Sequence, residues 1–345
     1  MTKPKTKSIV AHGCCRVDLA GGTLDLWPLY LFHPGAVTVN VGVSVMTHCR
    51  ITPVKGSGII LSSLDTGKQD RFQNARALLK TKKYQHALAG YLCRFFLRDD
   101  PKVGGFRLET HSDSPAGAGI SGSSALMIAT TAALARFTGR ELEKEKIREI
   151  AQNVEAQLIN VPTGCQDYYP ALYGGVSAIR LREDGIHRQK ISVSTAEMNS
   201  RFVLAYTGAP RQSGINNWEV FKSHINGDKR VFRNFEDIGA IAQEMESSLR
   251  KQDWDEVARL LRAEWKLRKT NAPGISTPLI DKLISGALKQ GARAAKVCGA
   301  GGGGCVIFLV KPGSQKRVAD SIVANGGQIL PFEVHEKGLI VSQEK

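Results

Sequence analysis

The stretch SPAGAGISGSSALM, residues 114–127, places three glycines and four serines at the entrance to the apolar run ALMIATTAALARF. So many glycines are costly in conformational entropy unless the backbone geometry requires them. A glycine-rich turn that opens a helix presents amides without intrahelical partners, and such amides bind phosphate groups. A mobile linker is the alternative, but a linker would not run at once into an apolar helix. The stretch therefore predicts a phosphate-binding turn and a helix over residues 124–138, ended by Gly139.

Length and composition indicate a globular protein with two domains. The chain has 345 residues, with 42% hydrophobic and 23% charged residues, and this length exceeds what one hydrophobic core usually serves. No segment approaches the roughly 20 apolar residues that span a bilayer, and the basic N-terminal residues lack the apolar core of a signal peptide. The seven cysteines form no C-x-x-C pair and no zinc-ligand spacing, which is typical of reduced thiols. We therefore expect a cytoplasmic protein with no membrane partner.

The net charge of +15 favours anionic partners, among them nucleic acids and small phosphorylated molecules. The basic residues are scattered, and their densest cluster, residues 250–269, interleaves acidic and apolar residues at helical spacing. We interpret this cluster as the solvated face of a helix, because the chain contains no recognised nucleic-acid-binding module. The charge instead suits an enzyme that handles phosphates, and no specific nucleic-acid partner is expected.

Hydrophobic spacing predicts the elements that surround the glycine-rich turn. Residues 1–60 are expected to form strands and turns, residues 83–99 a helix, and residues 104–115 a strand that enters the turn. A charged helix is predicted over residues 140–160, with an apolar face made of Ile147, Ile150, Val154 and Leu158.

The C-terminal half is predicted to hold strands and long helices. Residues 236–269 have helical spacing that is interrupted near Gln252 and Asp253, and a second glycine-rich turn runs into a strand near the end of the chain. The most suitable boundary lies near residues 185–200. The predicted domains are therefore residues 1–190 and 191–345.

Three glycine-containing features follow one another in the chain: RVDLAGGTLDL at residues 16–26, the central turn, and KVCGAGGGGCVIF at residues 296–308. The central turn is neither a Walker A motif, because no Gly-Lys-Ser/Thr follows it, nor a dinucleotide fingerprint. The chain resembles the GHMP kinases, the superfamily of galactokinase, homoserine kinase, mevalonate kinase and phosphomevalonate kinase. The central turn resembles the ATP loop of that superfamily, and residues 296–308 resemble its third motif. RVDLAGGTLDL, TGCQDYYPALYGG and YTGAPRQS are most similar to the bacterial heptose-phosphate kinases and fucokinases.

The resemblance implies an α+β fold of two domains, with an N-terminal ribosomal-protein-S5-like domain and a C-terminal ferredoxin-like domain. ATP and the acceptor would meet between them. The implied activity is an ATP- and Mg²⁺-dependent transfer of a phosphoryl group to a hydroxyl of a sugar or sugar phosphate, by a monomer or homodimer. A mevalonate-type or other non-sugar alcohol kinase is one alternative, and a non-catalytic sensor of sugar and nucleotide is another.

The resemblance assigns the phosphate loop residue by residue. Ser123 matches the serine that binds Mg²⁺ in the family, and Ser124 is the alternative if the register slips by one. Gly122 stands where relatives carry a hydroxyl residue, which removes one phosphate donor. The full set of residues expected to bind ATP is Pro115, Gly117, Ala118, Gly119, Ser121, Gly122, Ser123 and Ser124.

Glu155 and Asp167 match the metal-binding glutamate and the catalytic aspartate of the heptose-kinase pattern. Without the resemblance, Glu155 would be read as an ordinary surface carboxylate on a charged helix. Arg16 matches a basic position close to Asp167, and a cation there would lower the pKa of the aspartate. We therefore expect Asp167 mainly to orient the acceptor hydroxyl and Arg16 to stabilise charge on the moving phosphoryl group. A purely structural salt bridge is the alternative for Arg16.

Asp25 lies where sugar kinases of this group place an aspartate that binds acceptor hydroxyls. Gly22 and Thr23 replace the Glu-His pair of galactokinases, which argues against galactose as the substrate. These three residues are predicted to bind the acceptor.

Two further segments are expected to contact the acceptor. Arg211 could pair with a phosphate that the acceptor already carries, or with solvent alone. The glycine turn at residues 299–304, and Gly301 and Gly302 in particular, would approach the acceptor and the phosphate loop with bare backbone, and a tight turn that packs two domains together is the alternative.

Overall fold

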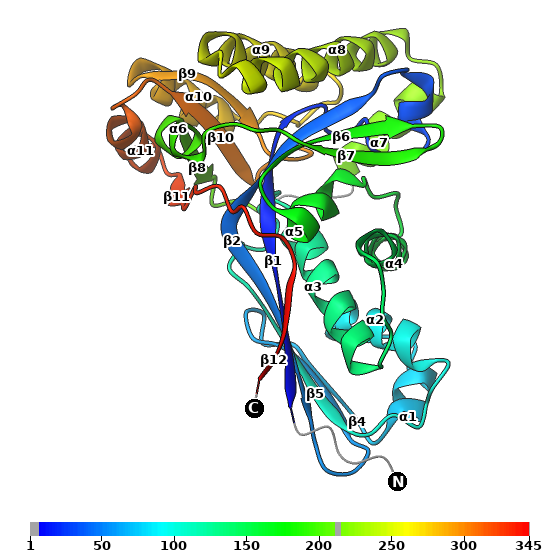
Figure 1. Ribbon diagram of the computed structural model, residues 1–345. Helices are drawn as coiled ribbons and strands as arrows, with labels where there is room; N and C mark the ends of the chain where they lie inside the picture. Colours follow the sequence, from blue (N-terminus) through cyan, green and yellow to red (C-terminus); the bar gives the residue numbers. More distant parts are fainter. Residues whose placement is uncertain (1–6, 211–214, 345) are drawn as a thin grey trace.

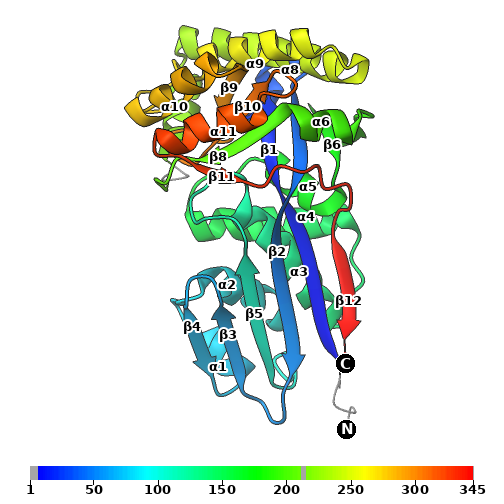
Figure 2. The ribbon, with the colours of Figure 1, turned by 90° about the vertical axis from the view of Figure 1, so that its left-hand side faces the viewer.

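The protein is described by a computed structural model over residues 7–210 and 215–344 (Figure 1). Its larger sheet consists of β1 (Ser8–Ala20), β2 (Val37–Pro53), β3 (Ile59–Ser63), β4 (Gln69–Phe72), β5 (Phe106–Ser112), β6 (Val176–Arg182), β7 (Gly185–Lys190) and β12 (Ile340–Glu344). The strand order is β12-β1-β2-β5-β3-β4, and β6 and β7 extend the sheet from β2. Figure 2 shows the strands from β4 through β3, β5, β2 and β1 to β12 side by side, with helices behind them.

The long strands β1 and β2 connect the two ends of the molecule. They pair antiparallel from Ile9 opposite Ile51 to Ala20 opposite Val39. Almost every residue of β1 is buried, because helices cover it along its length. The predicted site residue Arg16 belongs to this strand and is therefore buried as well.

Helices cover one face of the larger sheet. They are α1 (Ala75–Lys80), α2 (Ala87–Leu97), α3 (Gly122–Phe137), α4 (Lys144–Ile159) and α5 (Tyr169–Tyr173). The predicted helix after the phosphate-binding turn is confirmed as α3, and Gly139 follows it with a positive φ of 74°. The helix predicted over residues 140–160 is confirmed as α4 and begins four residues later than predicted. Its predicted apolar face packs into the core, with Leu158 only partly buried.

The smaller sheet consists of β8 (Phe202–Tyr206), β9 (Ala292–Val297), β10 (Cys305–Val310) and β11 (Gln328–Leu330). Its order is β11-β8-β10-β9, and every pairing is antiparallel. The helices are α6 (Thr195–Arg201), α7 (Ile215–Ile225), α8 (Lys229–Lys251), α9 (Trp254–Arg268), α10 (Pro278–Lys289) and α11 (Gln315–Ala324). Helices separate β8 from β9 and β10 from β11, and the strand order is fourth, first, third, second. This is the predicted ferredoxin-like arrangement.

The predicted break in the long C-terminal helical stretch is confirmed. Gln252 adopts a left-handed conformation and ends α8, and the Asp253 side chain accepts a hydrogen bond from the Glu256 amide at the start of α9. The resulting helix pair lies across one end of the molecule (Figure 1). The sequence did not indicate α7, or the first turns of α8 before residue 236.

The chain leaves the larger sheet after Lys190 and enters the smaller sheet at Phe202, and β12 then returns to pair with β1. One hydrophobic cluster contains residues of β1 and β2 together with Leu260 of α9 and Ile307 of β10. The α+β, two-domain architecture is as predicted, although the division at residue 190 stays a prediction. Among the described residues, none of the helices combines the length and apolar character needed to cross a bilayer.

Candidate active site

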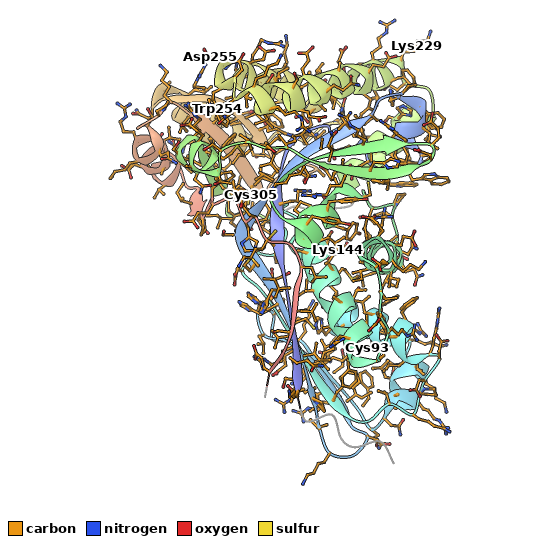
Figure 3. The ribbon with its side chains drawn as sticks, in the orientation of Figure 1. Cys93, Lys144, Lys229, Trp254, Asp255 and Cys305 are labelled. Atoms are coloured by element: carbon orange, nitrogen blue, oxygen red, sulfur yellow. The ribbon has the colours of Figure 1, made fainter. Side chains whose placement is uncertain are left out.

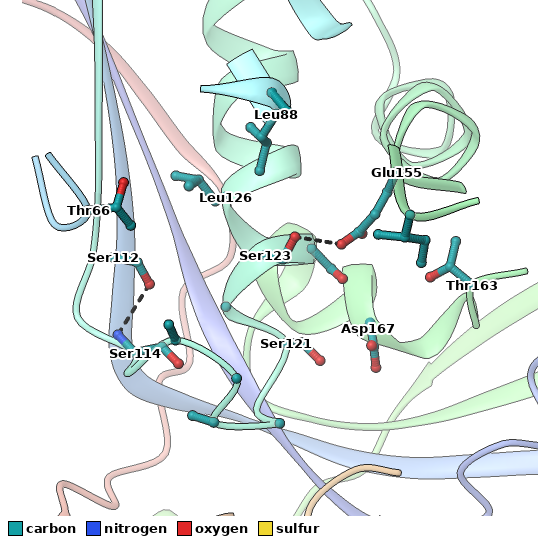
Figure 4. A pocket seen from close by; sticks show the side chains of 18 of the residues that line it. Thr66, Leu88, Ser112, Ser114, Ser121, Ser123, Leu126, Glu155, Thr163 and Asp167 are labelled. Atoms are coloured by element: carbon teal, nitrogen blue, oxygen red, sulfur yellow. Dashed lines mark hydrogen bonds between the residues drawn. The ribbon is translucent and has the colours of Figure 1, made fainter. Parts of the chain in front are cut away.

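A cavity of about 440 Å³ lies in front of the predicted phosphate loop. The loop forms one wall, and the end of α4 forms another (Figure 4). A third wall comes from residues 63–68 and 85–88, which lie before and at the start of α2. The volume falls in the usual range for a small-molecule site. All eight predicted ATP-binding residues line this cavity, on the wall that the loop and the start of α3 provide.

The backbone of the loop explains its glycines. Gly117, Gly119 and Ser121 have positive φ values of 69°, 75° and 62°. The first intrahelical bond of α3 runs from the Ala125 amide to the Ser121 carbonyl, so the amides of residues 122–124 precede the helical ladder. The Ser121 hydroxyl is buried and has no hydrogen-bond partner among the described residues. The turn therefore presents amides and one hydroxyl to an anion at a helix N-terminus.

Steric contact accounts for the glycine at position 122. A Cβ at Gly122 would lie 2.9 Å from the Ser114 Cβ and 3.0 Å from its Oγ. Packing between the start of α3 and Ser114, which follows β5, therefore excludes a side chain here.

Glu155 lies beside Ser123, as a metal site would require. The Ser123 Oγ donates to Glu155 Oε1 at 2.7 Å (Figure 4). The Tyr168 hydroxyl donates to Oε2 of Glu155 at 2.7 Å. Burial raises the pKa of Glu155, and the hydrogen bonds from Ser123, Tyr168 and Ser124 oppose that rise. Glu155 is therefore not the surface carboxylate that its charged helix suggested. Within the described residues, no group of three His, Cys, Asp or Glu side chains is arranged to hold a metal ion without further ligands.

Arg16 connects three segments of the site. Its Nε and Nη2 donate to Asp167 Oδ1 at 2.9 and 2.5 Å. Its Nη1 donates to the carbonyl oxygens of Gly119 and Cys298 at 2.9 and 2.7 Å. The guanidinium thus holds the aspartate, the phosphate loop and the late glycine turn together. The predicted proximity of Arg16 and Asp167 is observed, and Arg16 also makes the salt bridge of its alternative, structural role.

A second cavity of about 30 Å³ adjoins the first. Gly164, Asp167 and Asn217 line both cavities. The predicted acceptor residues Gly22, Thr23 and Asp25 line the second cavity alone, together with Arg16. Asp167 therefore stands at the junction of a large cavity and a small one.

Asp25 is a buried carboxylate with no cation bonded to it among the described residues. It accepts hydrogen bonds from the backbone amides of Gln166 at 2.9 Å and Thr23 at 3.1 Å. Burial, and then the nearby charge of Asp167, raises the pKa of Asp25 to about 7. A Cβ at Gly164 would collide with Asp25 Oδ2, so a glycine is needed opposite this carboxylate.

Within the late glycine turn, Gly301 and Gly302 do not line the small cavity. Gly301 and Gly302 lie against Ile275: the Gly302 amide donates to the Ile275 carbonyl at 2.9 Å, and a Cβ at Gly301 would collide with that carbonyl. Gly299 and Ala300 line the small cavity instead. Arg211, the predicted phosphate partner, lies outside the described residues.

The sequence did not indicate four buried charged residues that lie beside the small cavity. Lys296 Nζ donates to Asp18 Oδ2 at 2.9 Å and to Glu264 Oε2 at 2.8 Å. Arg268 bonds to both carboxylates from the end of α9. Burial alone would raise the pKa of Asp18, but Lys296 and Arg268 outweigh it and lower that pKa. We call Asp18, Glu264, Arg268 and Lys296 the charge tetrad. Its one signal in the sequence was a lysine inside an apolar strand, which requires a buried counterion.

Comparisons with known proteins agree with this geometry. Residues 84–175 match the family model of the GHMP kinases N terminal domain, and residues 245–328 match that of the GHMP kinases C terminal. A D-glycero-alpha-D-manno-heptose 7-phosphate kinase from Campylobacter jejuni is 24% identical over 343 residues, covering 96% of this chain and 98% of the relative. A mevalonate kinase from Pyrococcus horikoshii is 28% identical over 256 residues, 73% of each chain.

A solved structure shows the same fold. The D-glycero-D-manno-heptose 1-phosphate kinase from Bacteriodes thetaiotaomicron superposes with a TM-score of 0.78 and 21% identity, covering 97% of this chain and 98% of that one. The first family model contains the phosphate loop, Glu155 and Asp167, and the second contains the late glycine turn. This chain belongs to the GHMP kinases.

Proposed function

We propose that the protein is an ATP- and Mg²⁺-dependent kinase that transfers the γ-phosphoryl group to a hydroxyl of a sugar or sugar phosphate. One observation carries the proposal: Asp167 stands where the cavity in front of the phosphate loop meets the small polar cavity that contains Asp25. A donor phosphate and an acceptor hydroxyl would meet at that junction. Positioning and electrostatic stabilisation are the main requirements of phosphoryl transfer.

The large cavity suits ATP. The amides of residues 122–124 and the Ser121 hydroxyl would bind its phosphates, and the positive end of α3 would favour their charge. Ser123 and Glu155 fit Mg²⁺, which prefers one or two carboxylates together with phosphate oxygens and water. Bound there, the ion would supply positive charge that offsets the charge of the phosphates. The Tyr168 hydroxyl holds one Glu155 oxygen at 2.7 Å, which fixes the orientation of the carboxylate.

Asp167 would orient the acceptor hydroxyl for in-line attack. Both bonds from Arg16 go to Oδ1, and Oδ2 accepts no hydrogen bond from a described residue, so it is available to the hydroxyl. The side chain of Asp167 is 21% exposed, whereas that of Arg16 is 3% exposed. The carboxylate therefore faces the cavity, and the guanidinium holds it from behind. Arg16 would also offset charge on the phosphoryl group during transfer.

A sugar-type acceptor is supported by the polar character of the small cavity. The carboxylate of Asp25 can accept hydrogen bonds from two hydroxyl groups. The Thr23 hydroxyl lies 3.4 Å from Asn217 Oδ1. The relative matched over 96% of this chain is named for a heptose 7-phosphate, so that compound is our first candidate acceptor. The mevalonate kinase matched over 73% of the chain supports the second candidate, a non-sugar alcohol.

An ATP-consumption screen tests the proposal. D-glycero-D-manno-heptose 7-phosphate, the free heptose, mannose, galactose, fucose and mevalonate are compared as acceptors, and the phosphorylated product is identified by mass spectrometry. We expect turnover with a heptose or heptose phosphate. Turnover with mevalonate alone would replace the sugar assignment, and binding of ATP without turnover of any acceptor would favour the sensor.

The expected cytoplasmic location, monomer or homodimer state and lack of a nucleic-acid partner stay predictions from the sequence.

A further inference from the structure

The small cavity is lined by charges that almost all neutralise one another. Arg16 is paired with Asp167, and within the charge tetrad Lys296 and Arg268 are bonded to the carboxylates of Asp18 and Glu264. Asp25 is then the one carboxylate in the cavity without a cationic partner among the described residues. The described wall of the cavity therefore has no cation left over for a phosphate group.

One nitrogen of Arg268, Nη1, makes no bond to the other members of the charge tetrad. Its Nε donates to Glu264 at 3.2 Å, and its Nη2 contacts Glu264, the Gly22 carbonyl at 3.0 Å and Asp18 at 3.3 Å. Its Nη1 has a single partner among the described residues, the Thr23 hydroxyl at the long distance of 3.5 Å. A guanidinium carries two protons on this nitrogen. Arg268 is 4% exposed and lines the cavity. Its Nη1 is therefore a buried donor whose one acceptor lies at a long distance.

A buried donor of this kind needs an acceptor, because burying an N–H without a partner is costly. The groups that the cavity offers to a ligand are then of two kinds: Nη1 of Arg268 donates and the carboxylate of Asp25 accepts. A sugar hydroxyl both donates and accepts hydrogen bonds. Two hydroxyls of one sugar ring match this pair, whereas a phosphate dianion would face the unpaired Asp25.

We propose that Arg268 is a specificity-determining residue of the acceptor site. Its Nη1 donates to one hydroxyl oxygen of the sugar while Asp25 accepts from a neighbouring hydroxyl. The cavity takes the uncharged polyol end of the acceptor, and a phosphate on the acceptor lies outside this cavity. This inference rests on the proposed kinase function and adds the residue that selects the acceptor.

The placement of Arg268 gives it a second effect on the same site. It lies at the last residue of α9, and its Nη2 holds the carbonyl of Gly22 in the loop that carries Asp25. A change at Arg268 can therefore act by contact with the sugar or by displacing the loop. An experiment has to separate these two effects.

A cycle of protein and substrate changes separates them. Arg268→Lys keeps the charge opposite Asp18 and Glu264 but removes the guanidinium fork. The acceptors are D-glycero-D-manno-heptose 7-phosphate and its 2-, 3- and 4-deoxy analogues. For the natural protein, we expect kcat/KM to fall roughly 10- to 100-fold with one of these analogues, as when a charge-assisted hydrogen bond is lost. Arg268→Lys should lower kcat/KM with the parent sugar by a similar factor and with that analogue by much less. Equal losses with every acceptor would show that Arg268 acts only on the loop, and would overturn the proposal.

A comparison of the free heptose with heptose 7-phosphate tests whether a phosphate on the acceptor lies outside the cavity. Arg268→Lys should lower kcat/KM by the same factor for the free heptose and for heptose 7-phosphate. A loss confined to the phosphorylated sugar would mean that Arg268 binds the phosphate, and would also overturn the proposal. The matched control is Arg262→Lys, because Arg262 is exposed on the same helix and bonds to the Arg293 carbonyl away from the cavity. This control should leave both values unchanged.

Folding and function are checked separately. The melting temperature and the KM for ATP show whether Arg268→Lys folds. If it does not, the double variant Glu264→Gln/Arg268→Gln removes one charge of each sign and keeps the buried charges balanced. If the natural protein turns over no sugar, the kinase proposal fails. Calorimetric binding of heptose and its deoxy analogues to the natural protein and to Arg268→Lys then still tests the contact with Arg268.

Discussion

The backbone amide of Cys305 donates to the carbonyl oxygen of Ala118 at 2.6 Å. This bond joins the late glycine turn to the phosphate loop, and Cys305 lies where the C-terminal sheet meets the long strands (Figure 3). Arg16 makes the same connection a second time, because its Nη1 bonds to both Gly119 and Cys298. The conformation of the nucleotide loop therefore depends on a segment from the other end of the chain.

Gly304 is the residue on which this contact depends most closely. A Cβ there would lie 2.7 Å from the Ala118 carbonyl oxygen. Gly304→Ala should displace the phosphate loop and raise the KM for ATP at least about 10-fold, comparable to the loss of one phosphate hydrogen bond. Steady-state kinetics with varied ATP measures this change.

Gly313→Ala is the matched control for Gly304→Ala. Gly313 has a φ of 75°, close to the 77° of Gly304, but a Cβ there meets no atom within 4 Å. Both variants carry the strain of an alanine with positive φ, which costs on the order of 1 kcal/mol. An equal effect of the two on the KM for ATP would show that backbone strain, and not contact with Ala118, is responsible.

Asp167→Asn should lower kcat by at least about 10²-fold, the low end for a positioned catalytic group. Asparagine keeps an oxygen for Arg16 but loses the charge that orients the acceptor hydroxyl. The affinity for ATP should stay within a factor of about two, because Arg16 still bonds to Gly119 and Cys298. Rapid-quench and binding measurements check the two parts, and near-normal turnover would remove Asp167 from the mechanism.

Glu155→Gln and Ser123→Ala should each raise the Mg²⁺ concentration needed for half-maximal activity, because each removes one oxygen ligand or its partner. Tyr168→Phe should do so more weakly, since it releases one Glu155 oxygen without removing the carboxylate. The independent readout is calorimetric binding of ATP with Mg²⁺ and with a chelator present. Only the difference between the two conditions should shrink in the variants.

Ser124→Ala gives the register control for this metal site. The Ser124 side chain is buried, and it opposes the raised pKa of Glu155 less than Ser123 does. If Ser124→Ala alone raised the Mg²⁺ requirement, the assignment of the metal-binding serine would move by one residue.

The local features of the site could be predicted from sequence because short-range geometry determines them. The glycines at 117 and 119 have the positive φ values that such a turn requires, and Asp253 caps α9 at the break seen in the hydrophobic spacing. Glycine and capping residues act within a few positions, so their pattern is legible in a single chain.

The charge tetrad and the acceptor contacts of Arg268 could not be predicted in this way. Asp18, Arg268 and Lys296 come from β1, α9 and β9, and only the fold brings them together. Glu264 and Arg268 have the spacing of an ordinary ion pair on a helix surface. In the late glycine turn, sequence could not distinguish Gly301, which packs on Ile275, from Gly299, which lines the cavity.

Lys296→Met should destabilise the protein by about 3–5 kcal/mol, because it leaves two buried carboxylates with one cation between them. Lys296 has no exposed surface, and its Nζ bonds to both Asp18 and Glu264. Lys316→Met is the comparison, since Lys316 pairs with Asp320 but is 87% exposed, and its loss should cost less than about 1 kcal/mol. Urea denaturation gives both free energies of unfolding. A similar small cost for the two variants would contradict the role of Lys296 as the buried counterion of Asp18 and Glu264.

Asp25 makes both stability and acceptor binding depend on pH. Its pKa of about 7 in the folded protein lies above its ordinary value of 3.8. Between these two values the folded state keeps a proton that the unfolded state has released. The contribution of Asp25 to stability is therefore complete below about pH 4 and is lost as the pH rises to about 7. Asp25→Asn should be more stable than the natural protein at about pH 8, by at most on the order of 4 kcal/mol, and the difference should shrink towards about pH 5.

Acceptor binding should show the opposite dependence, because the ionised carboxylate is the better acceptor for sugar hydroxyls. With free heptose, which carries no titrating phosphate, the KM should fall as the pH rises through about 7 in the natural protein. The KM for ATP should not follow this curve, since Asp25 does not line the nucleotide cavity. Asp25→Asn should weaken heptose binding and remove the inflexion. A KM for heptose that stays flat between about pH 6 and pH 8.5 would show that Asp25 does not bind the acceptor as a carboxylate.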